Sequence, residues 1–277
     1  MVVCVHVSNS ISFLSGCADE QEIFTDFAHK SGGLPEDWGW MDILGLDPAL
    51  LNMVPEPCAG VILLFPCSDK IYEKRAALKA RLLQDDASPA AEKAYHVKQV
   101  AEFGNACGTI ASVHALINGS VIYNQDPNAH SALSEFRDGH ANDSAEDRGK
   151  ALLTANALRS SSDSSANHIS AQTECPDRNG PELDHHFVAF SPILLSNGNS
   201  SNTIHVVELD GTKILPVDHG SIDSILNNDN EEDEEEQAED PNKHKFLRAV
   251  AKVIKREYME VEPESIEFSM MALCKVK

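Results

Sequence analysis

Apolar residues recur at helical spacing in several separate stretches of the chain. Ile23, Phe24 and Phe27 fall on one side of a helical projection and predict a short helix over residues 20–30. Residues 70–84 combine many charged side chains with a narrow apolar stripe, which predicts an amphipathic surface helix. The same spacing predicts further helices over residues 105–119, 144 to about 157, and 243–257.

Other apolar runs have the length and spacing of strands. Residues 59–65 are continuously apolar and stop at Pro66, which predicts a central strand buried on both faces. The runs 186–190 and 203–209 are separated by an Asn-, Gly- and Ser-rich loop and predict a hairpin. Alternating apolar residues from Ile266 to Cys274 predict a last strand. Because strands and helices are mixed without a repeat or a clear linker, we expect an α/β (α+β) fold with residues 1–277 as one domain.

Three stretches are distinguished by their polar composition, and one of them, residues 159–182, shows no apolar periodicity. Residues 123–142 are polar, and residues 159–182 are rich in Ser, Asn and Gly, which predicts a long flexible loop. Residues 229–240 hold nine carboxylates and no cation. Such a block is typical of a solvated, disordered insert.

Charge and cysteine content narrow the classes of function. The net charge of -22 argues against nucleic acid and anionic membrane as direct partners, and favours a basic protein partner. The seven cysteines show neither a disulfide framework nor a CxxC pair, so we expect no metal and a reducing compartment. Cys58 and Cys274 lie in apolar runs and are expected in the core. We identify no signal peptide, and the longest apolar run is too short to span a bilayer.

Residues 105–109, Asn-Ala-Cys-Gly-Thr, hold the strongest candidate for chemistry. Asn105 is a good N-cap, the stripe that follows is helical, and Gly119 is placed to end the helix. A thiol in the first turn faces unpaired N–H groups and the positive end of the helix dipole, and both favour thiolate. Cys107 is therefore a candidate nucleophile. For an isolated motif of this kind a buried, inert cysteine is the more frequent outcome.

A cysteine nucleophile needs a base and a group that orients the base. If the predicted hairpin is symmetric about Gly198, His186 lies directly opposite Asp210 on the same face of the sheet, and His185 points to the other face. The alternative is that His186 and Asp210 are ordinary polar residues at strand ends, since Asp-Gly is above all a turn signal. No comparable partner is predicted for His6, His114, His205 or His219, and His114 is expected to pack within the helix.

An oxyanion site needs donors aimed at the developing negative oxygen. The backbone N–H of Cys107 is free at the helix start and can supply one donor. A nearby side-chain amide can supply the second. Gln99 and Asn105 are the candidates.

Several short motifs occur in an order that resembles the ubiquitin C-terminal hydrolases, the papain-like cysteine deubiquitinases. They are the segments at 34–38, 44–48, 53–55, 61–66, 98–99, 105–110, 186–187, 208–211 and 216–220. The resemblance implies that Cys107 is the nucleophile, His186 the general base and acid, Asp210 the orienting carboxylate and Gln99 the oxyanion-hole side chain. The family usually has this glutamine six residues before the cysteine, whereas Gln99 lies eight before Cys107. Either the longer turn bulges and the amide keeps its place, or the amide is displaced.

The resemblance also implies a fold and a substrate. We expect a central antiparallel sheet flanked by helices, a knotted backbone, and a crossover loop at about residues 156–183 that limits leaving-group size. The chain resembles the short members without a C-terminal extension. The expected activity is thiol-dependent hydrolysis after the C-terminal glycine of ubiquitin, or of a ubiquitin-like modifier, releasing small or unfolded adducts.

The remaining expectations concern partners and alternatives. We expect no cofactor, no nucleic-acid or membrane partner, a monomer, and a cytoplasmic location with the nucleus as a second compartment. One alternative function is a catalytically weak or inactive ubiquitin-binding module, suggested by the altered Gln99 spacing. The other is a scaffold that acts through the acidic block.

Overall fold

The computed structural model describes residues 18–32, 34–84, 86–103, 106–123, 130–166, 185–197, 201–227 and 243–277. Its strands are β1 (Trp38–Asp42), β2 (Cys58–Pro66), β3 (His185–Asn197), β4 (Ser201–Leu209), β5 (Val217–Ser221) and β6 (Ser269–Lys275). Its helices are α1 (Ala18–Ser31), α2 (Pro48–Leu51), α3 (Asp69–Leu82), α4 (Pro89–Lys93), α5 (Cys107–Tyr123), α6 (Ala132–Gly139), α7 (Ala145–Thr154), α8 (Asn156–Ala166), α9 (Ile222–Asn227) and α10 (Lys245–Ile254). A short 3₁₀ turn, η1, covers Ala101–Phe103, and α10 continues into a π-helical segment over Lys255–Met259.

The six strands form one antiparallel sheet in the order β1-β6-β2-β3-β4-β5. Strand β2 lies between β6 and β3, and all nine of its residues are buried. This confirms the central strand predicted from the apolar run. An antiparallel sheet with helices around it also confirms the predicted mixed fold class.

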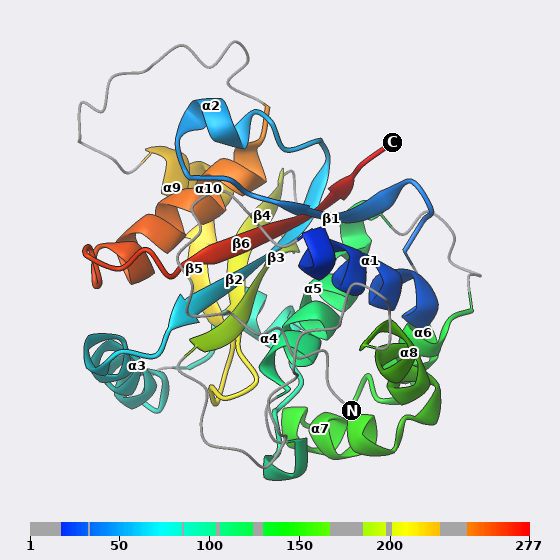
Figure 1. The fold of residues 1–277 in the computed structure, drawn as a ribbon. Coiled ribbons are helices and arrows are strands. Elements are labelled where there is room, and N and C mark those ends of the chain that lie inside the picture. The colour runs from blue at the N-terminus through cyan, green and yellow to red at the C-terminus, as the bar shows by residue number, and fades with distance from the viewer. Residues whose placement is uncertain are drawn as a thin grey trace.

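Helices cover both faces of the sheet, so the molecule has three layers (Figure 1). Because successive side chains of a strand point to opposite faces, β2 supplies both cores. Ile62 and Leu64 pack into the core formed with α1 and α5, whereas Val61, Leu63 and Phe65 pack into the core formed with α9 and α10. The strand therefore joins the two layers of helices.

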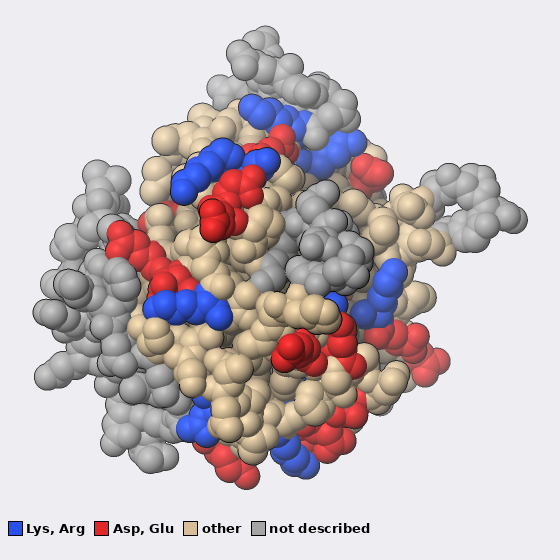
Figure 2. Space-filling view, turned by 90° about the vertical axis from the view of Figure 1, so that its right-hand side faces the viewer, with Lys and Arg blue, Asp and Glu red and all other residues tan. Residues whose placement is uncertain are grey.

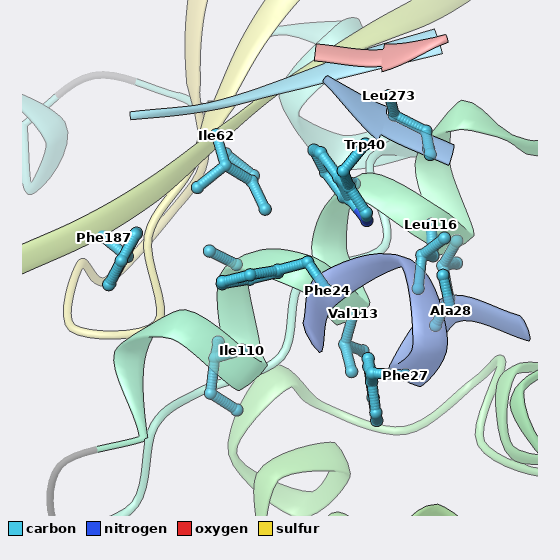
Figure 3. Packing of buried hydrophobic residues seen from close by; sticks show 14 of the residues in the cluster. Phe24, Phe27, Ala28, Trp40, Ile62, Ile110, Val113, Leu116, Phe187 and Leu273 are labelled. Atoms are coloured by element: carbon cyan, nitrogen blue, oxygen red, sulfur yellow. The ribbon is translucent and has the colours of Figure 1, made fainter. Parts of the chain in front are cut away.

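Phe24 of α1 lies at the centre of the first core. Its ring centroid is 6.0 Å from that of Trp40 on β1 and 6.0 Å from that of Phe187 on β3. Figure 3 shows the ring between the sheet and helix α5, near Ile62 and Val113. The helix predicted over residues 20–30 is confirmed, and its apolar stripe anchors α1 to the sheet.

Helix α5 does not end at Gly119, as its sequence predicts, but continues to Tyr123. Glycine inside a helix costs about 1 kcal/mol relative to alanine. Here the helix is buried for most of its length between the sheet and α1, and this packing outweighs the local cost. The tertiary environment thus overrides a stop signal that is valid for an exposed helix.

One element has no counterpart in the sequence predictions, and one prediction needs correction. The polar stretch 123–142 contains α6, which begins with a capping box formed by Ser131 and Ser134. The first part of the expected loop 159–182 is helical, because α8 extends to Ala166 and packs on α1. The rest of the expected crossover loop, residues 167–183, lies outside the described residues, as do the acidic insert 229–240, Gly198 and Asn105.

Cys58 on β2 and Cys274 on β6 are paired neighbours in the sheet, both buried and both free thiols. The prediction that they are small core residues is confirmed. In the part of the chain that the structure describes, no helix is both long and apolar enough to cross a bilayer. On the face shown in Figure 2, the described acidic and basic side chains are intermixed and separated by uncharged surface.

The packing of Phe24 predicts how much the protein is destabilised when this ring is removed. Phe24→Ala should lower the free energy of unfolding by about 3–5 kcal/mol, because it removes a fully buried ring from contact with two others. Denaturant unfolding of the purified protein measures this change. Leu83→Ala is the control, since Leu83 is 67% exposed and its loss should cost less than about 0.5 kcal/mol. Equal effects of the two substitutions would contradict the assigned core.

Candidate active site

Cys107 is the first residue of α5, and the fold buries it to 9% exposure. The helix starts against the end of the sheet where β2 finishes and β3 begins. Its first turn is closed by the hydrogen bond from the Ile110 N–H to the carbonyl of Ala106, at 3.0 Å. The thiol therefore lies in the first turn, as predicted, where backbone N–H groups have no partner inside the helix.

His186 lies at the start of β3, opposite Phe65 of β2. Its side chain is 13% exposed, and its ring meets that of Phe65 edge to face with centroids 5.7 Å apart. Nε2 contacts Oδ1 of Asp210 at 2.9 Å. Because Nε2 is occupied in this way, Nδ1 is the ring nitrogen available to Cys107, with which the imidazole also forms a side-chain hydrogen bond.

The hairpin register differs from the prediction, although the predicted pair is formed. Ala189 pairs with Leu209, so the hairpin is symmetric about residue 199 and Asp210 is not directly opposite His186. Extending the ladder places Asp210 two positions away along β4, as a diagonal neighbour. A shift of two residues keeps both side chains on the same face, since side chains alternate with a period of two. A diagonal pair of this kind is still within reach of a long side chain.

Asp210 is fully buried, and every part of its carboxylate is hydrogen-bonded. Oδ1 accepts from His186, from the Thr212 N–H at 2.8 Å and from the Thr212 hydroxyl at 2.8 Å. Oδ2 accepts from Nη2 of Arg75 on α3 at 2.6 Å. Burial alone would raise the pKa of this carboxyl, but the charges of His186 and Arg75 hold the pKa well below its usual range.

The pKa values of Cys107 and His186 shift in opposite directions. Burial raises the pKa of the thiol, but the hydrogen bond and charge of His186 outweigh burial and leave the pKa below its usual value. Burial lowers the pKa of the imidazole, but Asp210 outweighs burial and raises the pKa to about 9. These shifts favour a thiolate–imidazolium pair near neutral pH.

Gln99 lies beside the turn that follows Asp210. Its backbone N–H donates to the carbonyl of Gly211 at 2.9 Å. A Cβ added at Gly211 would lie 2.9 Å from both the Gln99 Cβ and the Ile110 Cγ2, so Gly211 packs closely between these two residues. The 3₁₀ turn η1 takes up part of the longer segment between Gln99 and Cys107. The structure thus brings Gln99 to the first turn of α5; Asn105, the other amide candidate, is not described.

Other histidines of the region have structural partners. Nε2 of His114 accepts from the Val97 N–H at 2.9 Å, and burial lowers the pKa of this histidine to about 3. This agrees with the prediction that His114 packs within α5. The prediction of no partner is wrong for His205, which contacts Asp218 at 3.0 Å, and for His219, which contacts Glu208 at 3.0 Å.

Two groups at the site were not singled out by sequence. Thr212 lies two residues after Asp210, and an aspartate side chain commonly accepts from the backbone N–H two residues on. Arg75 carries no such signal, because in sequence it is one of many charged residues on an amphipathic helix. Within the described residues, no group of three or more His, Cys, Asp or Glu side chains is arranged to hold a metal ion.

A mainly apolar hollow lies between α5 and the α7–α8 pair. It is lined by Phe27, Phe103, Ala106, Thr109, Val113, Leu152, Leu153, Leu158, Arg159 and Ser162. Two of these residues flank the first turn of α5, and three come from α8. The described part of the segment expected to form the crossover loop therefore lines a hollow that also includes Ala106, the residue before Cys107.

Comparison with known proteins agrees with this geometry. The family described as ubiquitin carboxyl-terminal hydrolase, family 1, matches residues 18–245. The chain belongs to the ubiquitin C-terminal hydrolase family. It is therefore a cysteine-type ubiquitin hydrolase, a thiol protease that acts on ubiquitin and its adducts. This confirms the resemblance found in the sequence motifs.

Individual relatives match over most of their length. The chain is 32% identical to a probable ubiquitin carboxyl-terminal hydrolase of Dictyostelium discoideum over 92% of this chain and 85% of the relative. It is 30% identical to ubiquitin carboxyl-terminal hydrolase isozyme L1 of Monodelphis domestica, over 88% and 90%. It is 29% identical to a ubiquitin carboxyl-terminal hydrolase of Drosophila melanogaster, over 91% and 93%.

The close contact at Gly211 predicts a sensitive position in this hydrolase. Gly211→Ala should lower kcat/KM on a ubiquitin C-terminal amide by about 10- to 100-fold, because the added methyl group pushes Gln99 and Ile110 apart. Gly139→Ala is the matched control, since a Cβ there meets nothing within 4 Å. Steady-state kinetics of both variants measure the difference. Unchanged turnover by Gly211→Ala would contradict the assigned contact.

Proposed function

We propose that this hydrolase cleaves the bond after the C-terminal glycine of ubiquitin with Cys107 as nucleophile, His186 as general base and acid, and Asp210 as the residue that orients His186. The observation that carries the proposal is the continuous hydrogen-bonded series from Cys107 through His186 to the buried Asp210. A nucleophile, its base and an orienting group within hydrogen-bond reach are what covalent catalysis by cysteine requires.

In the first half-reaction the Cys107 thiolate attacks the carbonyl carbon of the terminal glycine. The tetrahedral oxyanion is stabilised by the N–H of Cys107 and by the side-chain amide of Gln99. The His186 imidazolium then gives its proton to the departing amine or thiol, and a thioester to Cys107 remains. The contact of Gln99 with Gly211, which also lies against Ile110 of α5, supports its place in this step.

In the second half-reaction, His186 is neutral and removes a proton from water as the water attacks the thioester. The Cys107 sulfur leaves as thiolate and His186 is again protonated, while ubiquitin is released as a carboxylic acid that ionises by giving its proton to the solvent. Asp210 stays ionised throughout, because the Arg75 and Thr212 contacts stabilise its charge in the buried site. It holds the ring so that Nδ1 faces the reacting sulfur.

Small or unfolded adducts are the proposed leaving groups. Helix α8 forms the described beginning of the segment expected to cross over the site, and it lines the hollow next to the first turn of α5. We propose that the complete segment limits the leaving group to a flexible chain and excludes a folded domain. Whether ubiquitin itself or a closely similar modifier is preferred depends on contacts outside the catalytic residues.

Removal of the nucleophile is the direct test. Cys107→Ala should abolish hydrolysis of a fluorogenic ubiquitin C-terminal amide, while a ubiquitin-tailed electrophile should label the wild-type protein at Cys107. Cys274→Ala is the matched control, because Cys274 is also buried and free but lies in the sheet core. Equal turnover by Cys107→Ala and the wild type would end the proposal. Binding of ubiquitin without turnover by the wild type would identify a binding module instead.

The pKa shifts predict the pH dependence of the reaction. His186 has a raised pKa of about 9, so its proton is present below that pH and is lost as pH rises through it. kcat/KM should therefore fall above about pH 9. Asp210→Asn should move this alkaline limb to lower pH, because the imidazolium loses its carboxylate partner. A pH–rate profile of both proteins measures the shift, and an alkaline limb that is unmoved in Asp210→Asn would argue against the assigned pair.

A further inference from the structure

Arg75 is the partner of the Asp210 carboxylate that comes from helix α3, and it binds the oxygen that His186 does not. Its Nη2 donates to Asp210 Oδ2 at 2.6 Å and to the Thr212 hydroxyl at 2.8 Å. The Arg75 side chain is 19% exposed, and its guanidinium lies over the Phe65 ring at 5.6 Å from the centroid. It is therefore held from two directions.

We propose that Arg75 is a positioning residue of the hydrolase: it fixes the Asp210 carboxylate so that Oδ1 faces His186, and through His186 it supports the thiolate of Cys107. This inference rests on the proposed roles of the three residues. It adds a fourth charged group that does not touch the substrate.

The geometry of the carboxylate supports this role. Oδ2 is bound by Arg75 and Oδ1 by His186 and Thr212, so the plane of the carboxylate is fixed at both oxygens. Without Arg75, Oδ2 would lose its charged donor in a fully buried position, and the carboxylate could rotate away from the ring. Leaving a buried charge without its partner is costly, so the group would move or take up a proton.

The Phe65 ring places Arg75 and His186 relative to each other. The ring meets His186 edge to face, and the guanidinium lies over the same ring. Phe65 is itself fully buried on β2, the central strand. Arg75 and His186 thus share one rigid neighbour as well as one carboxylate.

The charges of the four groups alternate in sign: Arg75 positive, Asp210 negative, His186 positive and Cys107 negative. Other charged or titratable groups that act on this series are Cys67, Lys98, Lys213, Glu208, Tyr258, His96 and His114. Among the described residues, Arg75 is the only arginine bonded to Asp210. Removing it leaves the buried series with one negative charge in excess, which disfavours the thiolate at its other end.

The test compares Arg75→Gln with Arg75→Lys. Arg75→Gln should lower kcat on a ubiquitin C-terminal amide by about 10- to 100-fold, because a small misplacement of a catalytic group has effects of this size. It should also raise the pH at which Cys107 ionises, measured as the pH dependence of Cys107 alkylation. Arg75→Lys keeps the charge and should restore that pH in part or in full. Arg81→Gln, an exposed arginine on the same helix, is the matched control.

Two further measurements separate positioning from stability. Ubiquitin should bind equally well to Cys107→Ala and to Cys107→Ala with Arg75→Gln, because Arg75 is not a substrate contact. The loss caused by Arg75→Gln should largely disappear in an Asp210→Asn background if Arg75 acts through Asp210. A lowered melting temperature with unchanged kcat and unchanged ionisation of Cys107 would overturn the inference.

Refutation of the role of Arg75 can be distinguished from refutation of the proposed function by the behaviour of Asp210→Asn. If Asp210→Asn itself keeps wild-type kcat, the assigned triad is wrong whatever Arg75 does. If Asp210→Asn is impaired and Arg75→Gln is not, the triad stands and only the role of Arg75 is refuted.

Discussion

The buried negative charge of Asp210 is the constraint on which the site depends. A carboxylate fully removed from solvent persists only when charged partners and hydrogen-bond donors surround it. Here the partners come from α3, from β3 and from the turn after β4. The carbonyl of the same residue contacts His96 at 3.0 Å, which ties the segment before α5 to the same point. Satisfying one charge therefore brings together elements that are distant in sequence.

A second buried carboxylate, Glu208, lies two residues earlier on the same face of β4. It bonds Lys213, His219 and the hydroxyl of Tyr258. These contacts anchor the turn after Asp210 and the π-helical segment after α10 to the sheet. Lys98 adds to this anchoring, since its Nζ donates to the carbonyls of Thr212 and Lys213. The turn that carries Asp210 is thus held at several points and cannot move independently of the core.

The sequence alone was sufficient to predict the features that depend on local patterns of apolar and polar residues. The apolar run at β2, the stripe of α1 and the thiol in the first turn of α5 each follow from spacing that the structure retains. It was not sufficient where packing competes with local preference, as at Gly119, or where a helix contributes one polar contact, as at Arg75. A single arginine on an amphipathic helix has no periodic signature, and its partner lies 135 residues away.

The geometry of the β3–β4 hairpin explains why the His186–Asp210 pair was predicted correctly although the predicted strand register was wrong. The loop between β3 and β4 is symmetric about residue 199 rather than 198, so every cross-strand pair shifts by two positions. An odd shift would have moved Asp210 to the opposite face, but an even shift preserves the face. His186 then reaches a diagonal neighbour, which leaves room for Thr212 and Arg75 to contact the same carboxylate. The diagonal arrangement thus lets the chain surround a buried charge and still hold the imidazole at 2.9 Å.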